Sequence, residues 1–504
     1  MSAHNLTLWQ YLRALAVFGA AGLSGCATVG SSGVGGVVAV PRRWQAGNAK
    51  TGALDAAALA TWWERFRDPA LNELVRAALV ASPDVRTAVS KIAESRARRG
   101  VERASLFPWL TAGASASTSR QENRGGSNTV QLGTGSTGST STGVTTDLLQ
   151  QSTGLSQSTT RTQSYSGSLD ASWEVDLFGK QWQNVKARSA DLAQAQENFY
   201  AAQVSLVAEV AEEYVVLRQA EERLAVVEGS VATRSETLQI TQWREQAGQG
   251  NALETQQSLS TLEEARAAIP AYKETIGQSC NRLALLVGRT PGGVNAIVAK
   301  THSIPAAPAR LAIGIPAETL AQRPDVRAAE QAVYAAVART KSAQRERLPS
   351  LNISGTLSTE ALSSGRIFSP QAIAASLLAE LTAPIFKGGQ ITSTIMVQTE
   401  LERQALLTYE STVLTALSEV ENALISVQRT AERLAILVRA SAAARLAQQL
   451  AVQRYTAGEV DILTVLEAQR TLLSVEDEQV STRASQVSAH LKLYKALGGG
   501  WLPR

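Results

Sequence analysis

The chain has 504 residues, of which 44% are hydrophobic, 18% are charged and only 5% are aromatic. The scarcity of aromatic side chains and the abundance of Ala, Leu, Val, Gln, Ser and Thr favour long thin helices over compact globular domains. A formal net charge of +4 gives no basic field that would attract nucleic acid, and two cysteines and three singly scattered histidines exclude a disulfide framework and a metal cluster.

Residues 1–25 have the pattern of a secretory signal peptide. A weakly positive start and an apolar stretch, Ala14 to Leu23, precede small residues and Cys26. Because Leu23 to Cys26 form a lipobox, we expect Cys26 to carry a covalent diacylglycerol and an acyl chain, which together anchor the protein stably. Ala27, rather than an aspartate, follows Cys26, and in lipoproteins this generally implies sorting to the outer membrane. The alternative is an ordinary signal peptide with a chance cysteine.

Residues 26–53 show no periodicity. They are rich in Gly, Ser and Ala and contain Pro41, so we predict an extended lipid-anchored leader rather than a domain. A helical pattern begins near Leu54, has a start signal at Asp68-Pro69, and continues to about Ser105 with a break at Ser82-Pro83.

Strands are predicted where apolar and polar residues alternate. The clearest case runs from Tyr165 to Leu177, and Leu351 to Leu357 repeats the pattern. Weaker patterns predict strands from about Leu110 to Thr118 and from about Ser376 to Ile385. Between the first two strands lies the Ser/Thr/Gly-rich tract of residues 120–160, which we expect to be a long extracellular loop. Aromatic residues gather at the strand ends, as in a membrane interfacial belt: Phe107, Trp109, Trp173, Phe178, Trp182 and Phe386.

Two long helices are predicted after the strand pairs, from Gln181 to Gln246 and from Gln390 to Arg454. Each would be close to 100 Å long at about 1.5 Å per residue. Val413, Val420 and Val427 fall seven apart and interleave with other apolar residues, as in a coiled coil. Cys280 lies in an apolar helical segment and is expected to be an inert core thiol.

The second half of the chain repeats the first. The segment Ser82 to Ala88 is echoed by Arg323 to Ala329, and Ala247-Gly248 before Leu253 corresponds to Ala457-Gly458 before Leu463. Each half is therefore predicted to contain a helix, two strands, a long helix, a turn and a helix. The predicted organisation is a signal peptide, a leader, a first repeat at 54–310, a second repeat at 311–497 and a tail at 498–504.

The segment from Arg454 to Trp501 is predicted to be a turn followed by a long coiled-coil helix. Ala457-Gly458 marks the turn, because glycine tolerates the left-handed conformation there. Leu466, Leu473, Val480, Val487 and Tyr494 then fall seven apart. Near the turn, Asp461, Thr464, Glu467 and Thr471 form a polar stripe at i+3 and i+4 spacing, which we expect to face water.

This C-terminal segment resembles the outer-membrane efflux family of TolC-like ducts, and in particular the lipoprotein branch that serves resistance-nodulation-division pumps. The resemblance is carried by Tyr455 to Gly458, by Ile462 to Gln469 (ILTVLEAQ) and by Leu493 to Trp501 (LYKALGGGW). It implies a homotrimer whose periplasmic entrance is narrowed by a ring of acidic side chains. Glu467 matches the ring acid nearest the alanine, whereas Thr464 stands where some members carry a second aspartate.

The resemblance also implies partners: a periplasmic adaptor protein at the helical hairpin tips and a proton-driven pump in the inner membrane. The tips are Gln246 to Asn251 and Thr456 to Val460. The residues that we expect to contact the adaptor are therefore Ala247, Gly248, Gln249 and Gly250 in the first tip and Ala457, Gly458, Glu459 and Val460 in the second. At the entrance, we expect Glu467, with Asp461 and Thr464 nearby, to repel its symmetry mates and to attract cations. The alternatives are that the tip glycines serve only the turns and that Glu467 is an ordinary exposed glutamate.

The strand count determines how such a chain would cross a membrane. No charge-free apolar run of about eighteen residues follows Cys26, so the sequence predicts a closed barrel as the spanning structure. Four strands are too few, because membrane barrels have about eight or more. Two chains would give eight strands and three would give twelve, and the resemblance implies three. The expected fold is therefore mainly α, with long antiparallel coiled-coil helices in an α-barrel and four strands per chain in a trimeric twelve-stranded β-barrel.

Together with these features, the resemblance implies a passive exit duct for small molecules, such as drugs or toxic compounds, in a tripartite efflux system. A duct for type I protein secretion is the first alternative, and a lipid-anchored coiled-coil scaffold without a pore is the second. A scaffold would leave the strand pairs and their aromatic ends unexplained. An enzyme is disfavoured, because no nucleophile-base pair, nucleotide-binding loop or cofactor motif is present in the sequence.

Overall fold

The computed structural model describes residues 41, 43–45, 59–123, 158–308, 316–363, 366–367 and 369–501. These residues form two compact units. The first, which we call the helical unit, contains the described residues of 1–92, 193–333 and 403–504, and the second, the sheet unit, contains those of 93–192 and 334–402. Each predicted repeat contributes to both units, and the boundaries of the repeats stay a prediction.

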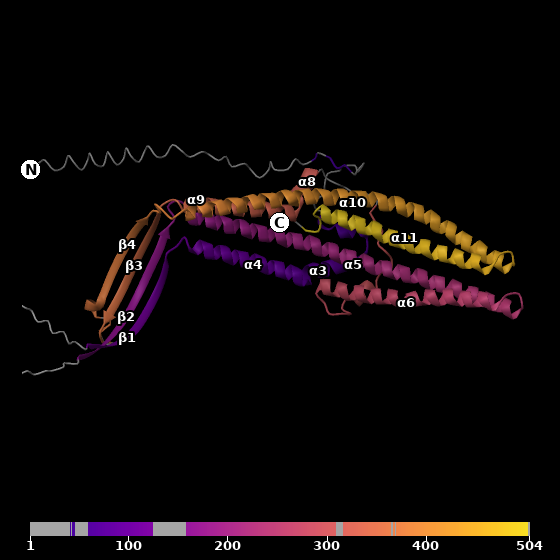
Figure 1. Ribbon diagram of the computed structural model, residues 1–504, viewed down its shortest axis with the longest axis horizontal. Coiled ribbons are helices and arrows are strands. Elements are labelled where there is room, and N and C mark those ends of the chain that lie inside the picture. Colours follow the sequence, from indigo (N-terminus) through magenta and orange to yellow (C-terminus); the bar gives the residue numbers. More distant parts are fainter. Residues whose placement is uncertain are drawn as a thin grey trace, which may run out of the picture. The chain divides into compact units, whose positions relative to one another are not determined.

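The sheet unit is built on four antiparallel strands in the order β1-β2-β3-β4 (Figure 1). The strands are β1 (Trp109–Asn123), β2 (Ser158–Val175), β3 (Ser350–Ala361) and β4 (Ile373–Thr382), and the short helix η4 (Pro370–Ala372) precedes the last of them. All four predicted strands are present. The first two extend further than predicted, to Asn123 and from Ser158, whereas β4 ends before the predicted Ile385 because Pro384 has no N–H to donate to a ladder.

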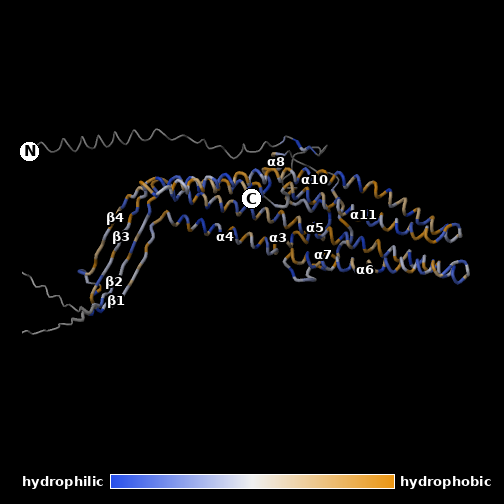
Figure 2. The backbone as a smooth tube through the Cα atoms, viewed as in Figure 1, coloured by the Kyte–Doolittle hydropathy of each residue, from blue (hydrophilic) through white to orange (hydrophobic). Residues whose placement is uncertain are grey.

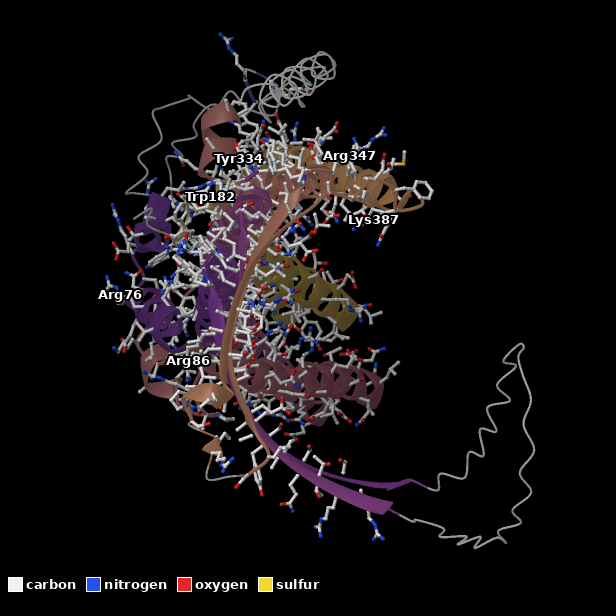
Figure 3. The ribbon with its side chains drawn as sticks, turned by 90° about the vertical axis from the view of Figure 1, so that its left-hand side faces the viewer. Arg76, Arg86, Trp182, Tyr334, Arg347 and Lys387 are labelled. Carbon is white, nitrogen blue, oxygen red and sulfur yellow. The ribbon has the colours of Figure 1, made fainter. Side chains whose placement is uncertain are left out.

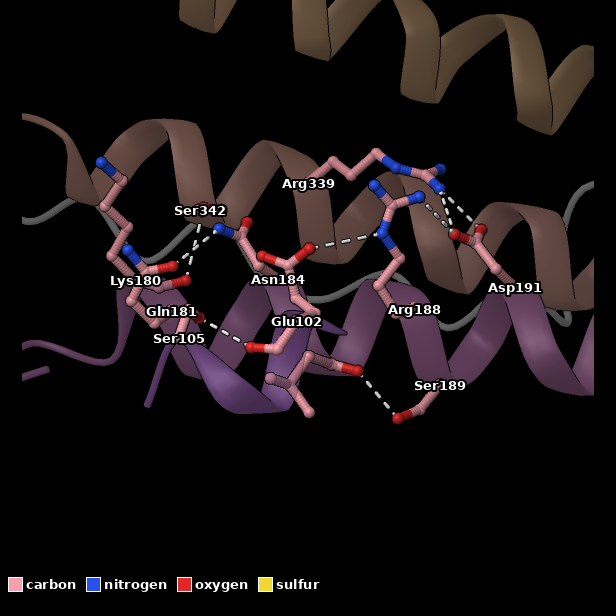
Figure 4. A network of polar contacts seen from close by, with 11 residues as sticks. Glu102, Ser105, Lys180, Gln181, Asn184, Arg188, Ser189, Asp191, Arg339 and Ser342 are labelled. Atoms are coloured by element: carbon pink, nitrogen blue, oxygen red, sulfur yellow. Dashed lines mark hydrogen bonds and ion pairs between the residues drawn. The ribbon is translucent and has the colours of Figure 1, made fainter. Parts of the chain in front are cut away.

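Helices leave one end of this sheet, and polar contacts join them. Within the sheet unit, the end of α4 (Pro83–Ala104), the start of α5 (Lys180–Gln246) and the end of α9 (Pro324–Arg345) meet in the network that Figure 4 shows. Arg188 Nε donates to Glu102 Oε2 at 3.4 Å, and Arg339 Nη2 lies 2.6 Å from Asp191 Oδ1. The side chains are half-buried, so these pairs fix the helices relative to one another more firmly than exposed pairs would.

The helical unit contains most of two long hairpins, whose first helices begin in the sheet unit. The helix α5 is followed by α6 (Ala252–Val287), and α10 (Gln390–Thr456) is followed by α11 (Ile462–Ala496). Both α5 and α10 have 67 residues, which is about 100 Å at about 1.5 Å per residue, so the predicted length is confirmed. In Figure 2 hydrophobic and hydrophilic residues alternate along these helices, as expected for helices that pack along one another.

In the core of the helical unit, short helices pack against the long helices of the hairpins. The 3-10 helix η2 (Trp62–Phe66) is followed by α3 (Pro69–Ala81), while α7 (Asn295–Val298) and α8 (Pro316–Gln322) belong to the connection between the two halves. The ring of Trp62 is fully buried and stacks on Tyr494 of α11 with centroids 5.2 Å apart. This contact joins η2 to the C-terminal motif.

Local signals explain where these helices begin and end. Asp68 caps α3, since its carboxylate accepts from the backbone N–H groups of Ala70 and Leu71, and Pro69 occupies the first turn. The helix ends at Ala81 and α4 begins at Pro83, which confirms the predicted break. The signal peptide, Cys26, most of the leader, loop residues 124–157 and the last three residues of the tail lie outside the described residues.

Candidate functional site

The sheet has one apolar face and one polar face. Residues opposite each other across the ladders share a face, and the register places Leu110, Ala171, Gly355 and Leu377 in one row. The rows on either side of it on this face are also apolar; they contain Ala112, Leu169, Leu357 and Ala375, and Trp173, Ile353 and Ala379. The opposite face carries mainly Ser, Thr and carboxylate side chains, with Trp109, Gly113, Ala374 and Leu378 as exceptions.

The apolar rows together form a band across the sheet, which we call the apolar band. Its height matches that of the lipid-facing part of a membrane β-barrel. On β2 it runs from Tyr165 to Val175, about 33 Å along the strand at about 3.3 Å per residue. A tilt of about 40° reduces this to about 25 Å along the membrane normal, which is the height of the lipid-facing band of membrane β-strands. The aromatic residues Tyr165 and Trp173 lie near its two ends, and Trp173 Nε1 donates to the Leu106 carbonyl at 3.0 Å.

Hydrogen bonds organise the polar face. The carboxylate of Asp170 accepts from Ser168 at 2.8 Å and from Thr356 of the next strand at 3.0 Å. Ser115 and Ser166, opposite each other on β1 and β2, are also hydrogen-bonded, at 2.7 Å. At the helical end of the sheet, Trp182 and Lys387 lie toward opposite sides of the strands in Figure 3. A face of this composition is suited to water rather than to lipid.

The two hairpin tips have the same local structure. Gly248 and Gly458 adopt left-handed conformations, with φ of +73° and +77°, and the next residue in each tip donates its N–H to a carbonyl five residues earlier, at 2.8 Å in the first tip and 2.9 Å in the second. This is the glycine-dependent end that the sequence predicts for α5 and α10. The tip residues 247–249 and 457–459 are exposed, whereas Gly250 and Val460 are half-buried.

The helices that follow the tips are capped in the same way. Asn251 and Asp461 are the N-caps of α6 and α11, and their side chains accept from the backbone N–H groups of Glu254 and Leu463 respectively. Asp461, which the sequence predicts to lie at the entrance, has a structural role in starting α11, and its role at the entrance stays a prediction. Thr464 and Glu467 are exposed, as predicted for the polar stripe, and the Glu467 carboxylate lies 3.7 Å from Arg470 of the same helix.

A contact between the hairpins near their tips was not predicted. Tyr455 of α10 donates its hydroxyl to Glu254 of α6 at 3.0 Å, while Arg244 of α5 donates to the Tyr455 carbonyl at 2.7 Å and lies over the Tyr455 ring. We call these three residues the tip clasp. Burial and then the hydrogen bond to Glu254 raise the pKa of Tyr455 to about 12, so the hydroxyl is protonated at neutral pH.

Further from the tips, ion pairs hold α11 to its neighbours. Arg223 of α5 pairs with Asp477 at 2.9 Å, and Arg483 of α11 pairs with Glu222 of α5 at 3.0 Å. A cavity of about 640 Å³ lies between α5, α10 and α11 and is lined by residues such as Gln469. The two hairpins are thus joined at the tip clasp and at these ion pairs, with a gap in their packing between α5 and the second hairpin.

The structure also describes Cys280 and the His, Cys, Asp and Glu residues that could bind a metal. Cys280 is half-buried, packs against the main core and has a pKa raised by burial, which suits the predicted core thiol. Among the described residues, no cluster of His, Cys, Asp or Glu could hold a metal ion.

Within the described part of the chain, none of the helices combines the length and the apolar content needed to cross a membrane.

The chain is similar to several proteins of known name. It shares 28% identity over 466 residues with the pyoverdine export outer membrane protein OpmQ of Pseudomonas putida strain KT2440, covering 92% of this chain and 93% of that one. It shares 29% identity with the probable efflux pump outer membrane protein TtgC of the same strain, covering 92% of this chain and 90% of the relative.

Solved structures agree with these relatives. The outer-membrane channel OprN superposes with a TM-score of 0.77 at 29% identity, covering 92% of this chain and 100% of that chain. The open state of the MtrE outer membrane channel of Neisseria gonorrhoeae gives a TM-score of 0.73 at 28% identity, covering 92% and 96%. The profile of the family described as outer membrane efflux protein matches residues 74–289 and 315–499. This chain therefore belongs to the outer membrane efflux protein family, as its C-terminal motif predicted.

Proposed function

We propose that this protein is the outer membrane exit duct of a tripartite efflux system, through which small molecules pass without a chemical step. The main observation behind this proposal is that the sheet has one apolar and one polar face. The apolar band of about 25 Å fits the bilayer, and the polar face suits a water-filled lumen. The relatives named for pyoverdine export and for pump-driven efflux support a small-molecule cargo.

Three chains would complete the membrane part. The edge strands β1 and β4 have no partner on their outer sides among the described residues, and an open sheet edge in lipid leaves backbone groups unsatisfied. Joining β4 of one chain to β1 of the next in a ring of three would give twelve strands. In the same ring the long hairpins would form a hollow α-barrel in the periplasm.

The entrance of this duct would lie at the hairpin tips. Glu467 of each chain is exposed there and would approach its symmetry mates, so we infer a negatively charged constriction that attracts cations. The tip clasp would keep the second hairpin against the first until a periplasmic adaptor, bound at the exposed tips, shifts it. An inner-membrane pump would supply the energy.

The lipid anchor is a separate part of the proposal. Cys26 follows a lipobox, and acylation there would hold the start of the mature chain in the membrane. Mass spectrometry of the mature N-terminal peptide is expected to show a diacylglycerol and an acyl chain on Cys26, both of which Cys26→Ser would remove. An unmodified mature Cys26 would contradict the anchor without affecting the duct.

Conductance tests the duct itself. Purified full-length protein, reconstituted in planar lipid bilayers, is expected to produce discrete channel openings with a preference for cations. Protein that is folded by circular dichroism, yet gives no conductance at any voltage or pH, would contradict the proposal.

A further inference from the structure

One polar residue interrupts the buried face of α11 near its tip. Ile462, Val465 and Gln469 follow one another at steps of three and four, so they lie on one face of the helix. All three are buried, with exposed fractions of 2%, 0% and 4%. Apolar residues are usual at such positions in packed helices, and a polar side chain there costs stability. The first half of the chain has Leu259 at the corresponding distance from its own tip.

The two ends of the Gln469 carboxamide differ in their hydrogen bonding. Nε2 donates to the Thr237 hydroxyl of α5 at 2.7 Å, whereas Oε1 is inaccessible to solvent and accepts no hydrogen bond from any described residue. Thr237 has a second partner, because its hydroxyl donates to the Thr233 carbonyl at 3.0 Å. A buried acceptor without a partner destabilises the arrangement that buries it, since it has lost its hydrogen bonds to water.

The cavity between α5, α10 and α11 lies beside this carboxamide. The residues that line it run from Gln469 to Arg483 on α11 and from Glu222 to Thr233 on α5, so Gln469 is at the end nearer the tips. Movement of the second hairpin away from the first would break the bond to Thr237 and open Oε1 toward this cavity of about 640 Å³. Water could then pair with both ends of the carboxamide.

We propose that Gln469 is a gating residue, whose unpaired oxygen raises the free energy of the joined hairpins and thereby favours their separation. The inference rests on the proposed function, in which the entrance opens as the second hairpin moves away from the first. Gln469 would act against the tip clasp, since the Tyr455 hydroxyl stabilises the joined arrangement through its bond to Glu254. The position of the second hairpin would thus depend on two opposing groups.

The test compares three variants of the full-length protein with the wild type, by open probability in planar bilayers and by thermal unfolding. Gln469→Leu removes the unpaired acceptor and adds a side chain that prefers burial, while Thr237 keeps its bond to Thr233. Gln469→Glu keeps the shape and introduces a charge, which is costlier to bury than an amide. Gln453→Leu is the matched control, because Gln453 is an exposed glutamine of α10.

We expect the open probability of Gln469→Leu to fall about tenfold or more, because separation of the hairpins no longer hydrates a carboxamide and exposes a leucine. Its melting temperature should rise by about 2 °C or more, against the usual direction for a core substitution. Gln469→Glu, measured at about pH 8 to keep the carboxylate charged, should show the opposite changes. Gln453→Leu should match the wild type in both measurements.

An open probability of Gln469→Leu that equals or exceeds that of the wild type would overturn the proposal. A melting temperature that does not rise would also overturn it, because Oε1 would then have a partner, such as a bound water, that leucine loses. A higher melting temperature with unchanged open probability would limit the effect to folding and exclude gating. Absence of channels in the wild type would contradict the duct as well, whereas wild-type channels that do not respond to Gln469→Leu contradict only the gating role.

Discussion

The hydroxyl of Tyr455 is the smallest group whose removal should change the behaviour of the duct. It bonds to Glu254 across the two hairpins, and Tyr455→Phe deletes this bond while the ring can still pack beneath Arg244. Losing a hydrogen bond to a charged partner costs about 1.5–3 kcal/mol, so we expect open probability in planar bilayers to rise about tenfold. Tyr409→Phe, in the same helix, is the control and should not change it. Equal open probability in Tyr455→Phe and the wild type would contradict a role for the clasp.

The same hydroxyl predicts a pH dependence. The pKa of Tyr455 is raised to about 12 in the folded protein, whereas an unfolded tyrosine has a pKa of about 10. The stabilisation is therefore complete below about pH 10 and is lost as pH rises toward 12. Thermal unfolding followed from pH 8 to 12 should show a larger alkaline loss in the wild type than in Tyr455→Phe. Parallel curves would contradict a raised pKa of Tyr455 in the folded protein.

The acidic residues near the tips can be neutralised without disturbing the helix. Asn caps helices about as well as Asp, and Glu467 has an exposed side chain, at 70% relative accessibility, so Glu467→Gln with Asp461→Asn should leave α11 intact. We expect the double variant to lose cation selectivity, measured as a reversal potential across a salt gradient. Unchanged selectivity and conductance would exclude a charged constriction at these residues.

The glycine run at the C-terminus is explained by close packing. A Cβ on Gly499 would lie 2.9 Å from both the Leu59 carbonyl oxygen and the Trp62 ring, closer than Cβ atoms come to other heavy atoms in proteins. Gly499→Ala should therefore destabilise the protein by about 1–3 kcal/mol. Gly277→Ala, at an open position of α6, is the control and should stabilise by about 0.5–1 kcal/mol. Thermal melts by circular dichroism compare the two, and equal melting temperatures would contradict this account.

At the scale of elements, the hairpin tips expose leucines at equivalent positions. Leu253 and Leu463, in the first turns of α6 and α11, are 65% and 53% exposed. Aspartate is favourable in the first turn of a helix, so Leu253→Asp/Leu463→Asp should fold and yet weaken adaptor binding about tenfold or more. Leu285→Asp, at the other end of α6 and equally exposed, is the control. Binding measured by surface plasmon resonance that falls equally in both variants would contradict a contact at the tips.

Much of the element structure could be predicted from the sequence, because it depends on local periodicity. The alternation along Tyr165 to Leu177 and the breaks at Ser82-Pro83 and Gly458 are read directly from neighbouring residues. The outer ends of β1 and β2 were missed because their Ser, Thr and Gln side chains do not alternate in hydrophobicity. Arg244, Glu254 and Tyr455 meet only through the register of three helices, which no local pattern specifies, although an arginine and a tyrosine beside the tips could have suggested a contact.

At the scale of the whole molecule, the strand count makes a prediction about mass. With 53.4 kDa per chain, light scattering of the detergent-purified protein should give three times this protein mass before any processing or lipidation is considered. Circular dichroism should show sheet signal together with strong helix signal. A stable monomer, or a dimer with eight strands, would exclude the proposed ring.

The near-identity of the two tips has a consequence for the stoichiometry of any complex. Each chain has two hairpin tips with the same glycine turn and the same kind of helix cap. A trimer would therefore offer six quasi-equivalent docking points around its rim. A partner with a single type of contact surface could occupy alternate points with three subunits or all of them with six. Because each chain is internally duplicated, a trimer with threefold symmetry could bind a ring of six partner subunits, with every subunit at an equivalent tip.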